Sequence, residues 1–304
     1  MNPKPASASF SRQGLALVAF GASLLGFAGV FVKFGLLGGA TPVTIGLYRM
    51  LFALPGILWL AARRGIQWGP GVIWAAIAGV AFAGDLNLWH LSMKDTSAAN
   101  STFIVCGLTP VWVALYSVAV HKTRYRLSGW VGQTLGVSGA LLLALARGAR
   151  VGTGRGELLA IIASFCYATF SITLSRSRRH LSARQALLWM SLGSLASFAI
   201  LELLLREPLA GYTPLGWAGL LGLALIVQLL AWLIINRGMG QVNVALGTLG
   251  LSVQQIATPF LAAWLLHEEL RPLGLFGGLL IIAGIVLVAT GEARYGARLP
   301  TRAR

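Results

Sequence analysis

Two charged side chains lie deep inside apolar stretches of this sequence, where an isolated charge is costly. Arg49 lies in the stretch 42–62, and Asp85 lies in the stretch 70–92. A carboxylate can bind an ammonium group or carry a proton, and a guanidinium can pair with a carboxylate. Both residues lie roughly 10 Å from the same end of their stretches if each is a helix. The sequence therefore predicts either an ion pair that fixes helix packing or two side chains that line a cavity.

Other polar residues share helical faces with aromatic rings. Asp85, Trp89 and Ser92 are spaced i, i+4, i+7, and Gln228 and Trp232 are spaced i, i+4. Polar stripes beside rings suit a cavity for a small polar substrate, although each residue alone can be an interhelical hydrogen bond. We expect this cavity near the membrane midplane, and its substrate-binding residues are predicted to be Asp85, Trp89, Arg49, Asn100, Gln228, Trp232, Ser252 and Gln255.

Composition indicates that membrane-spanning helices hold these side chains. Hydrophobic residues make up 57% of the 304 residues, charged residues 11%, and the mean hydropathy is +0.77. Soluble domains of this size need more surface charge, and disorder needs lower hydrophobicity, so both classes are excluded. The net charge of +16 comes from short basic clusters between apolar runs, as in cytoplasmic loops of membrane proteins. We therefore expect lipid contacts and no nucleic-acid partner.

Apolar runs of about 20 residues, the length that crosses a bilayer core, recur along the chain. They predict an all-α integral membrane protein with ten transmembrane helices, over residues 14–37, 42–62, 70–92, 97–120, 128–146, 157–175, 184–206, 213–235, 241–266 and 272–291. Lys33 is expected to snorkel from the end of the first helix to the interface. Glu268 and Glu269, at the end of the ninth helix, are expected to be solvated.

The basic residues predict the orientation through the positive-inside rule. If both termini are cytoplasmic, the connections between helices on the cytoplasmic side hold most of the lysines and arginines. The other side then holds only Lys33, Lys94, Arg147, Arg150, Arg155, Arg206 and Arg271, and Arg49 lies within the membrane. The chain is therefore expected in the cytoplasmic (inner) membrane of a bacterial-type cell.

An internal repeat divides the chain into two halves, residues 1–150 and 151–304, which together form one transmembrane domain. Thr109-Pro110 and Thr258-Pro259 each fall in the fourth helix of a half, and Gly132/Gly139 and Gly277/Gly284 share one spacing in the fifth. Five helices per half is odd, so the second half must be inverted in the membrane. Such repeats place a site between them, with Pro110 and Pro259 as candidate hinges.

Small-x-x-x-small pairs occur in both fifth helices, as Gly132/Gly136 and Gly274/Gly278. They permit close packing of these helices on each other. The contact can lie within one chain or between two, so a monomer and a homodimer both fit.

The sequence resembles the EamA-type branch of the drug/metabolite transporter superfamily over its whole length. The resemblance rests on the run from Asp85 to Asn100, on the two Thr-Pro pairs, and on His267-Glu-Glu-Leu270 before a Gly-rich last helix. Among family branches it is most similar to exporters of amino acids, including the YddG-type exporters of aromatic ones. The resemblance implies ten helices in two inverted five-helix repeats and the export of small metabolites.

Together these features predict a secondary transporter that exports amino acids or similar metabolites by alternating access. The alternatives are an integral membrane enzyme and a channel. An enzyme needs a nucleophile–base pair or metal ligands, and His267-Glu268-Glu269 lacks the spacing of H-E-x-x-H. A channel needs a polar filter, and no filter-like loop is evident. We expect no cofactor, no metal and no enzymatic activity, and we expect Cys106 and Cys166 to act as small packing residues.

Overall fold

The structure is a computed structural model that describes residues 12–63, 65–121, 127–146, 154–239, 241, 251, 253–269 and 271–296. Within these residues every regular element is a helix, which confirms the all-α class. The helices are α1 (Arg12–Leu25), α2 (Ala28–Leu37), α3 (Pro42–Ala62), α4 (Pro70–Asp95), α5 (Ala98–His121), α6 (Leu127–Ala146), α7 (Arg155–Ser177), α8 (Ala183–Leu205), α9 (Pro214–Gly222), the π-helix η1 (Leu223–Ala231), α10 (Trp232–Met239), α12 (Val253–Leu266) and α13 (Pro272–Gly296).

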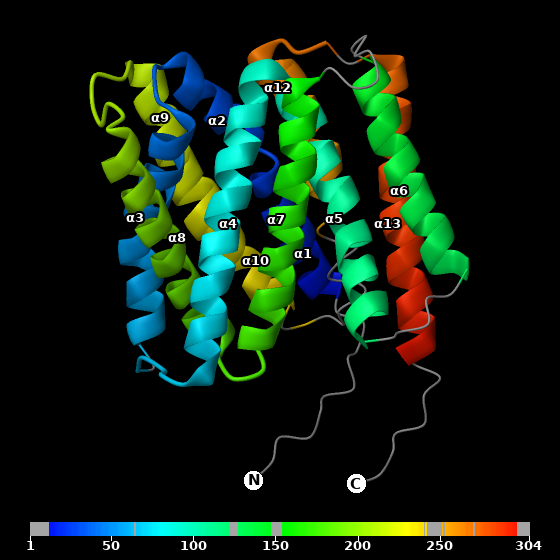
Figure 1. The fold of residues 1–304 in the computed structure, drawn as a ribbon, viewed down its shortest axis with the longest axis horizontal. Coiled ribbons are helices and arrows are strands. Elements are labelled where there is room, and N and C mark those ends of the chain that lie inside the picture. The colour runs from blue at the N-terminus through cyan, green and yellow to red at the C-terminus, as the bar shows by residue number, and fades with distance from the viewer. Residues whose placement is uncertain are drawn as a thin grey trace, which may run out of the picture.

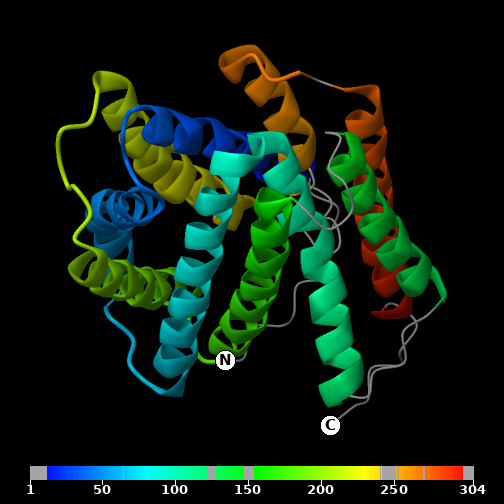
Figure 2. The same cartoon turned by 45° about the horizontal axis from the view of Figure 1, so that its top comes forward.

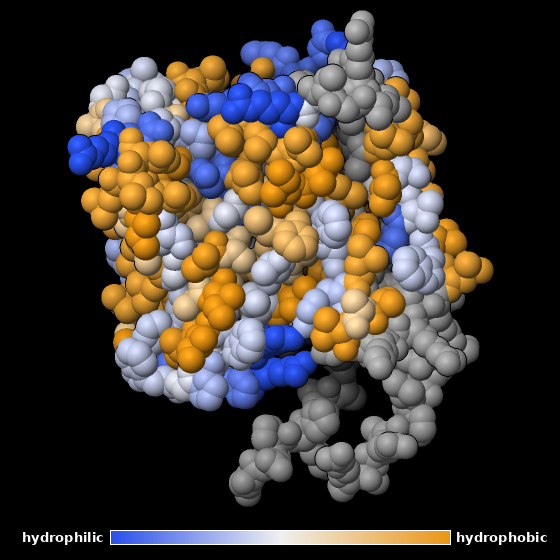
Figure 3. All heavy atoms as spheres, viewed as in Figure 1, coloured by the Kyte–Doolittle hydropathy of each residue, from blue (hydrophilic) through white to orange (hydrophobic). Residues whose placement is uncertain are grey.

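Seven of the described helical segments are long and apolar enough to cross a membrane, and shorter apolar segments cover 256–266 and 272–284. Large apolar side chains such as Leu203 and Trp264 are exposed on the outside of the bundle. On the face in Figure 3, hydrophobic residues cover the middle, and the most hydrophilic ones gather toward the two ends. A surface of this kind is suited to lipid around its middle and water at its ends.

The helices run between two ends of the bundle, which we call the upper and lower ends as drawn in Figure 1. The turn between α4 and α5 lies at the upper end, and the turn between α7 and α8 lies at the lower end. Several helices begin at a local signal. At the start of α3, Thr41 is the N-cap residue, Pro42 is the first helical residue, and Thr44 completes a capping box with Thr41. α9 likewise starts with Thr213 as the N-cap residue, directly before Pro214.

Two expected helices differ in detail from a plain α-helix. The expected span 14–37 is divided into α1 and α2, and the break includes Gly26, where an added Cβ would lie 2.8 Å from the Cβ of Ala257. The expected span 213–235 is continuous but changes from α9 into the π-helix η1 and back into α10. Part of the expected span 241–266, including Ser252, lies outside the described residues.

The core is built by contacts between helices from the two halves. α4 packs against α7 and α8, α3 packs against α8 and η1, and α5 packs against α7. Similarly, α1 packs against α10 and α12, and α2 packs against α9. Figure 2 shows α1 and α2 beside α9 and α10 at one side of the bundle, with α4 and α7 next to each other in front.

The pair α6 and α13 stands at one edge of the bundle in Figures 1 and 2. Glycines allow these two helices to approach closely. A Cβ added to Gly139 would lie 2.4 Å from the carbonyl oxygen of Gly277, and one added to Gly284 would lie 2.4 Å from that of Gly132. The expected packing of the two Gly-rich helices is therefore found, and it lies within one chain.

Candidate functional site

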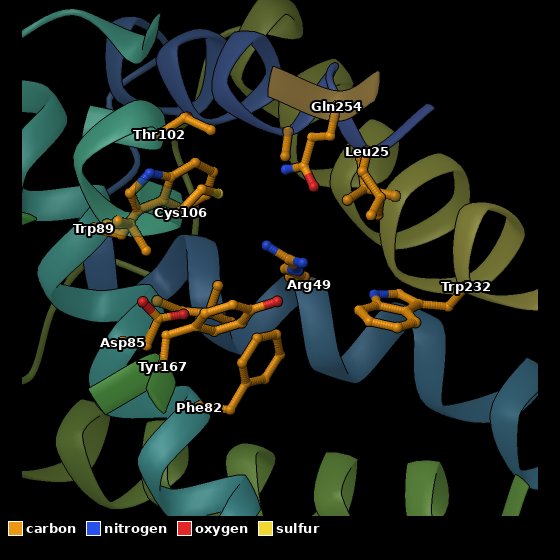
Figure 4. A pocket seen from close by; sticks show the side chains of 14 residues that line it. Leu25, Arg49, Phe82, Asp85, Trp89, Thr102, Cys106, Tyr167, Trp232 and Gln254 are labelled. Carbon is orange, nitrogen blue, oxygen red and sulfur yellow. The ribbon is translucent and has the colours of Figure 1, made fainter. Parts of the chain in front are cut away.

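A cavity of about 80 Å³ lies at the centre of the bundle, where helices of both halves meet. This volume exceeds several-fold the roughly 10–15 Å³ that a single water requires. α4 supplies four of the lining residues, and α5, α7, η1, α10 and α12 supply others (Figure 4). The lining consists of Leu25, Ala28, Arg49, Phe82, Asp85, Leu86, Trp89, Thr102, Val105, Cys106, Tyr167, Val227, Trp232 and Gln254.

Arg49 and Asp85 both reach this cavity, and each is only 4% exposed. In Figure 4 they lie on opposite sides of the space, with the ring of Tyr167 between them in that view. The expected ion pair is not formed between these two described residues. Instead, Arg49 Nε donates a hydrogen bond of 2.9 Å to Gln228 Oε1, and its guanidinium lies 5.7 Å from the centre of the Phe82 ring.

Three buried polar atoms around this site have no hydrogen-bond partner among the residues that the structure describes. They are Arg49 Nη1, Asp85 Oδ1 and Gln228 Nε2. An unpaired buried polar atom costs about 1–3 kcal/mol, and more if its group is charged. A ligand with both hydrogen-bond donors and acceptors would therefore lower the free energy of the site by pairing with these atoms.

Aromatic side chains form the walls around these charges. Trp89 from α4 and Trp232 from α10 lie on opposite sides of the cavity in Figure 4, and the indole of Trp232 points toward Arg49. Tyr167 from α7 and Phe82 from α4 pack close to each other through Phe170. The rings supply flat apolar surface next to a cation and an anion, which suits a small ligand that is both charged and apolar.

The predicted site residues fall into three groups. Asp85, Trp89, Arg49 and Trp232 line the cavity, and Gln228 supports it through Arg49. Asn100 is buried at the start of α5 but is not among the lining residues. Ser252 and the side chain of Gln255 lie outside the described part of the chain, as does the side chain of Pro110. Pro259 is inside α12, as expected, and its role as a hinge stays a prediction.

Several lining residues were missed by the sequence interpretation. Gln254 reaches the cavity from α12, one position before the predicted Gln255. Tyr167 was overlooked although it lies in the middle of a long apolar helix, away from the helix ends where tyrosine is common. That position was the available signal. Phe82 and Cys106 carry no such signal, because apolar residues in the middle of a membrane helix are ordinary.

Side chains from several elements hold the turn between α4 and α5 at the upper end. Lys33 Nζ from α2 donates to the carbonyl oxygens of Met93 and Thr96, the latter at 3.0 Å. Thr96 Oγ1 donates to Glu157 Oε1 of α7 at 2.8 Å, and the Ala98 amide donates to Glu268 Oε1 at 3.0 Å. The expectations of a snorkelling Lys33 and a solvated Glu268 were therefore wrong, because both find backbone partners in this turn.

A second cavity, of about 60 Å³, lies between α7 and α8 near the lower end. Trp232 belongs to its wall as well as to the wall of the central cavity. Arg178 is the one charged side chain among its described lining residues. They are Phe170, Leu174, Arg178, Ala183, Ala186, Leu187, Met190 and Trp232.

The fold and the cavity define an all-helical membrane protein with a largely apolar chamber that contains two charged side chains, and the comparisons name its family. The model of the EamA-like transporter family matches residues 12–145 and 154–290, one match in each half. The chain therefore belongs to the EamA-like transporter family and is a membrane transporter.

Two known proteins show the extent of this similarity. The chain is 23% identical over 262 residues to the "Uncharacterized transporter YwfM" of Bacillus subtilis (strain 168). This alignment covers 84% of this chain and 86% of that protein. A crystal structure of another protein has the same fold, with a TM-score of 0.66 and 20% sequence identity. That match covers 94% of this chain and 99% of the other.

Proposed function

We propose that this chain is a secondary transporter that exports amino acids by alternating access around the central cavity. The single observation that carries the proposal is the pair Arg49 and Asp85. Both charges face one cavity without forming an ion pair, and polar atoms of both are unpartnered. A free amino acid carries an ammonium group and a carboxylate, which complement Asp85 and Arg49 respectively.

The energetics favour a substrate as the missing partner. Taking an ion out of water costs several kcal/mol unless attraction and hydrogen bonds compensate for it. Gln228 compensates for part of this cost at Arg49, but its geometry leaves Arg49 Nη1 open. An amino acid between Arg49 and Asp85 would satisfy both charges at once. Trp89, Trp232 and Tyr167 would then contact its side chain, which favours aromatic or other bulky apolar amino acids.

The helix contacts support two inverted five-helix repeats, residues 1–150 and 151–304, in a ten-helix bundle. Under this arrangement α4 corresponds to α9–α10, and α7 corresponds to α1–α2. The contact of α4 with α7 then has its counterpart in α1 with α10, and that of α4 with α8 in α3 with η1. Likewise, the contact of α5 with α7 has its counterpart in α1 with α12.

Local geometry at the two Thr-Pro pairs supports the same repeat. Thr109 Oγ1 donates to the carbonyl oxygen of Val105 at 2.6 Å, and Thr258 Oγ1 donates to that of Gln254 at 2.8 Å. Each threonine thus bonds back by four residues just before the proline. The match favours equivalent positions in two copies of one unit, with Pro110 and Pro259 as the points where each helix can bend.

Counterflow into liposomes tests the proposal directly. The purified protein would be tested with an amino acid, with the amine that lacks its carboxylate, and with the acid that lacks its amino group. We expect efficient exchange only of the complete amino acid. In Asp85→Asn, exchange should fall by about tenfold or more, because a hydrogen bond to a charged group is worth about 1.5–3 kcal/mol.

Glu269→Gln is the matched control, because it also removes a carboxylate charge, but at a position that is 80% exposed and paired with Arg271. It should exchange amino acids like the parent. Equal exchange by Asp85→Asn and the parent would overturn the role of Asp85. Exchange of the amine and the acid at the rate of the amino acid would overturn the amino-acid assignment.

A further inference from the structure

Trp232 is the one described residue that lines both cavities. Among the other lining residues, α7 contributes Tyr167 to the central cavity and Phe170 to the second. The central cavity holds Arg49 and Asp85. The second lies between the lower parts of α7 and α8, and Arg178 belongs to its wall. Phe170 of the second cavity also packs against Phe82 and Tyr167 of the central cavity, so aromatic rings, with Trp232 common to both linings, lie between the two spaces.

The position of Trp232 mirrors that of Trp89 under the proposed repeat. In α4, Asp85 is followed four residues later by Trp89, and in the corresponding helix Gln228 is followed four residues later by Trp232. Both helices begin with a proline at their first turn, Pro70 and Pro214. Because the halves are inverted, Trp89 lies on the way to the upper end and Trp232 on the way to the lower end.

The backbone next to Trp232 is suited to a change of position. The π-helix η1 ends at Ala231, directly before Trp232, and it contains Gln228. π-helices are uncommon and occur frequently at functional sites. Rewinding of η1 to α-helical geometry would change the direction of Trp232 and of Gln228 together. Since Gln228 holds Arg49 at 2.9 Å, the ring and the charged site would move as one unit.

We propose that Trp232 is the gate between the substrate cavity and a lower vestibule, formed by the second cavity, in which Arg178 attracts the carboxylate of the substrate. This inference rests on the proposed transport function for its direction and its substrate. The two ends of the path differ in kind. Polar contacts tie the turn at the upper end to other helices, whereas aromatic rings, with Trp232 in both linings, lie between the substrate cavity and the vestibule at the lower end.

Cys106 provides a built-in probe, because it lines the central cavity and is a free thiol. In a Cys166→Ala background, membrane-impermeant thiosulfonate reagents would be added from the lower side of oriented vesicles. Trp232→Ala should raise the labelling rate of Cys106 by about tenfold or more, because a closed state commonly leaves the open one only about 0.1–10% populated. Trp232→Leu, which retains an apolar side chain on α10, should give a smaller increase, and Trp232→Phe should match the parent.

Two matched controls separate the gate from general loosening of the lower end. Trp189→Ala removes a ring that packs at a tilt against Trp68 near the lower end and lines neither cavity, so it should leave the rate unchanged. In Trp232→Ala, an anionic reagent should label faster than a cationic one. Adding Arg178→Gln should lower that ratio by about sevenfold, whereas Arg179→Gln should not, because one charge at roughly 7 Å in water changes the rates of an anion and of a cation by about threefold each, in opposite directions.

Labelling does not depend on the substrate, so the gate and the transport function can fail separately. Unchanged labelling in both Trp232→Ala and Trp232→Leu overturns the gate, even if amino acids exchange. Faster labelling without any amino-acid exchange supports the gate and overturns the proposed substrate. Equal effects of Arg178→Gln and Arg179→Gln on the reagent ratio overturn the role of Arg178 in the vestibule.

Discussion

The upper and lower ends of the central cavity are closed in different ways. At the upper end, Lys33, Glu157 and Glu268 from three separate elements bond to the turn between α4 and α5. At the lower end, Trp232 lines both the central cavity and a second cavity, and Phe170 of the second cavity packs against Phe82 of the central one. Hydrogen bonds contribute about 0.5–1.5 kcal/mol each, and more with charged partners, so the upper end opens only when several contacts break together. At the lower end, the contacts between the two cavities are those of aromatic rings.

This difference assigns a conformation to the structure. A transporter with alternating access must close one end while the other opens. At the upper end, α2, α7 and the residues after α12 all bond to the same turn. The structure therefore fits a form that is closed at the upper end and near to opening at the lower end. Under the proposed repeat, the turn that corresponds to it lies between α10 and α12, mostly outside the described residues.

The largest expected effect concerns which end faces the cytoplasm. Basic residues between the apolar stretches predict both termini inside, which makes the lower end cytoplasmic. Single cysteines that replace Lys4 or Arg302, in a chain without Cys106 and Cys166, should be fully protected from impermeant thiol reagents in intact cells. They should react after the cells are made permeable. Labelling in intact cells would reverse the assignment of the two ends.

The next largest effect should come from breaking two contacts at the upper end. Thr96→Val removes the hydroxyl that bonds Glu157, and Glu268→Ala removes the acceptor of the Ala98 amide. If each contact contributes about 1 kcal/mol and they add, Cys106 should react about thirtyfold faster with reagent from the upper side.

The matched control for this double variant is Glu269→Ala alone, which removes the exposed neighbouring carboxylate. Its rate from the upper side should equal that of the parent, because the Glu269 side chain is 80% exposed and pairs with Arg271 at 3.5 Å. If the double variant also labels at the parental rate, these contacts do not close the upper end, and the contrast between the two ends disappears.

The sequence predicted the charged centre of the site because the cost of charge in a membrane is large. Asp85 and Arg49 stand out in apolar helices, and both line the cavity. The four helices predicted to line it, α4, α5, the α9–α10 segment and α12, all contribute residues. The ion pair was a reasonable alternative at equal depth, but depth gives no information on the direction of a side chain around the helix axis.

Other features depend on contacts that a single sequence does not reveal. The π-helix has no composition of its own, and its wider turns change which residues face inward, so the partnership of Gln228 with Arg49 was not foreseen. Glu268 was expected in water because it follows the end of a helix, yet the first turn of α5 offers an unpaired amide to it. Such partners are far apart in the chain and are brought together only by packing.

The smallest expected effect is on selectivity, at Trp89. Its ring is 7% exposed and lines the cavity near Asp85, but the polar contacts of the upper end close that end without it. Trp89→Ala should therefore leave access from the upper side nearly unchanged and weaken the binding of large side chains. An aromatic contact is worth about 0.5–1.5 kcal/mol, so the ratio of phenylalanine to alanine counterflow should fall by about two- to tenfold.

Trp217→Ala is the control for this loss, because Trp217 packs against Tyr48 and Tyr212 and does not line the cavity. It should leave the ratio unchanged. An equal fall for phenylalanine and alanine in Trp89→Ala would mean that the ring supports the fold of the site and does not contact the substrate. A faster reaction of Cys106 from the upper side would mean that Trp89 closes that end. The two tryptophans would then have equivalent roles, and the difference between the ends would lie only in the polar contacts around the α4–α5 turn.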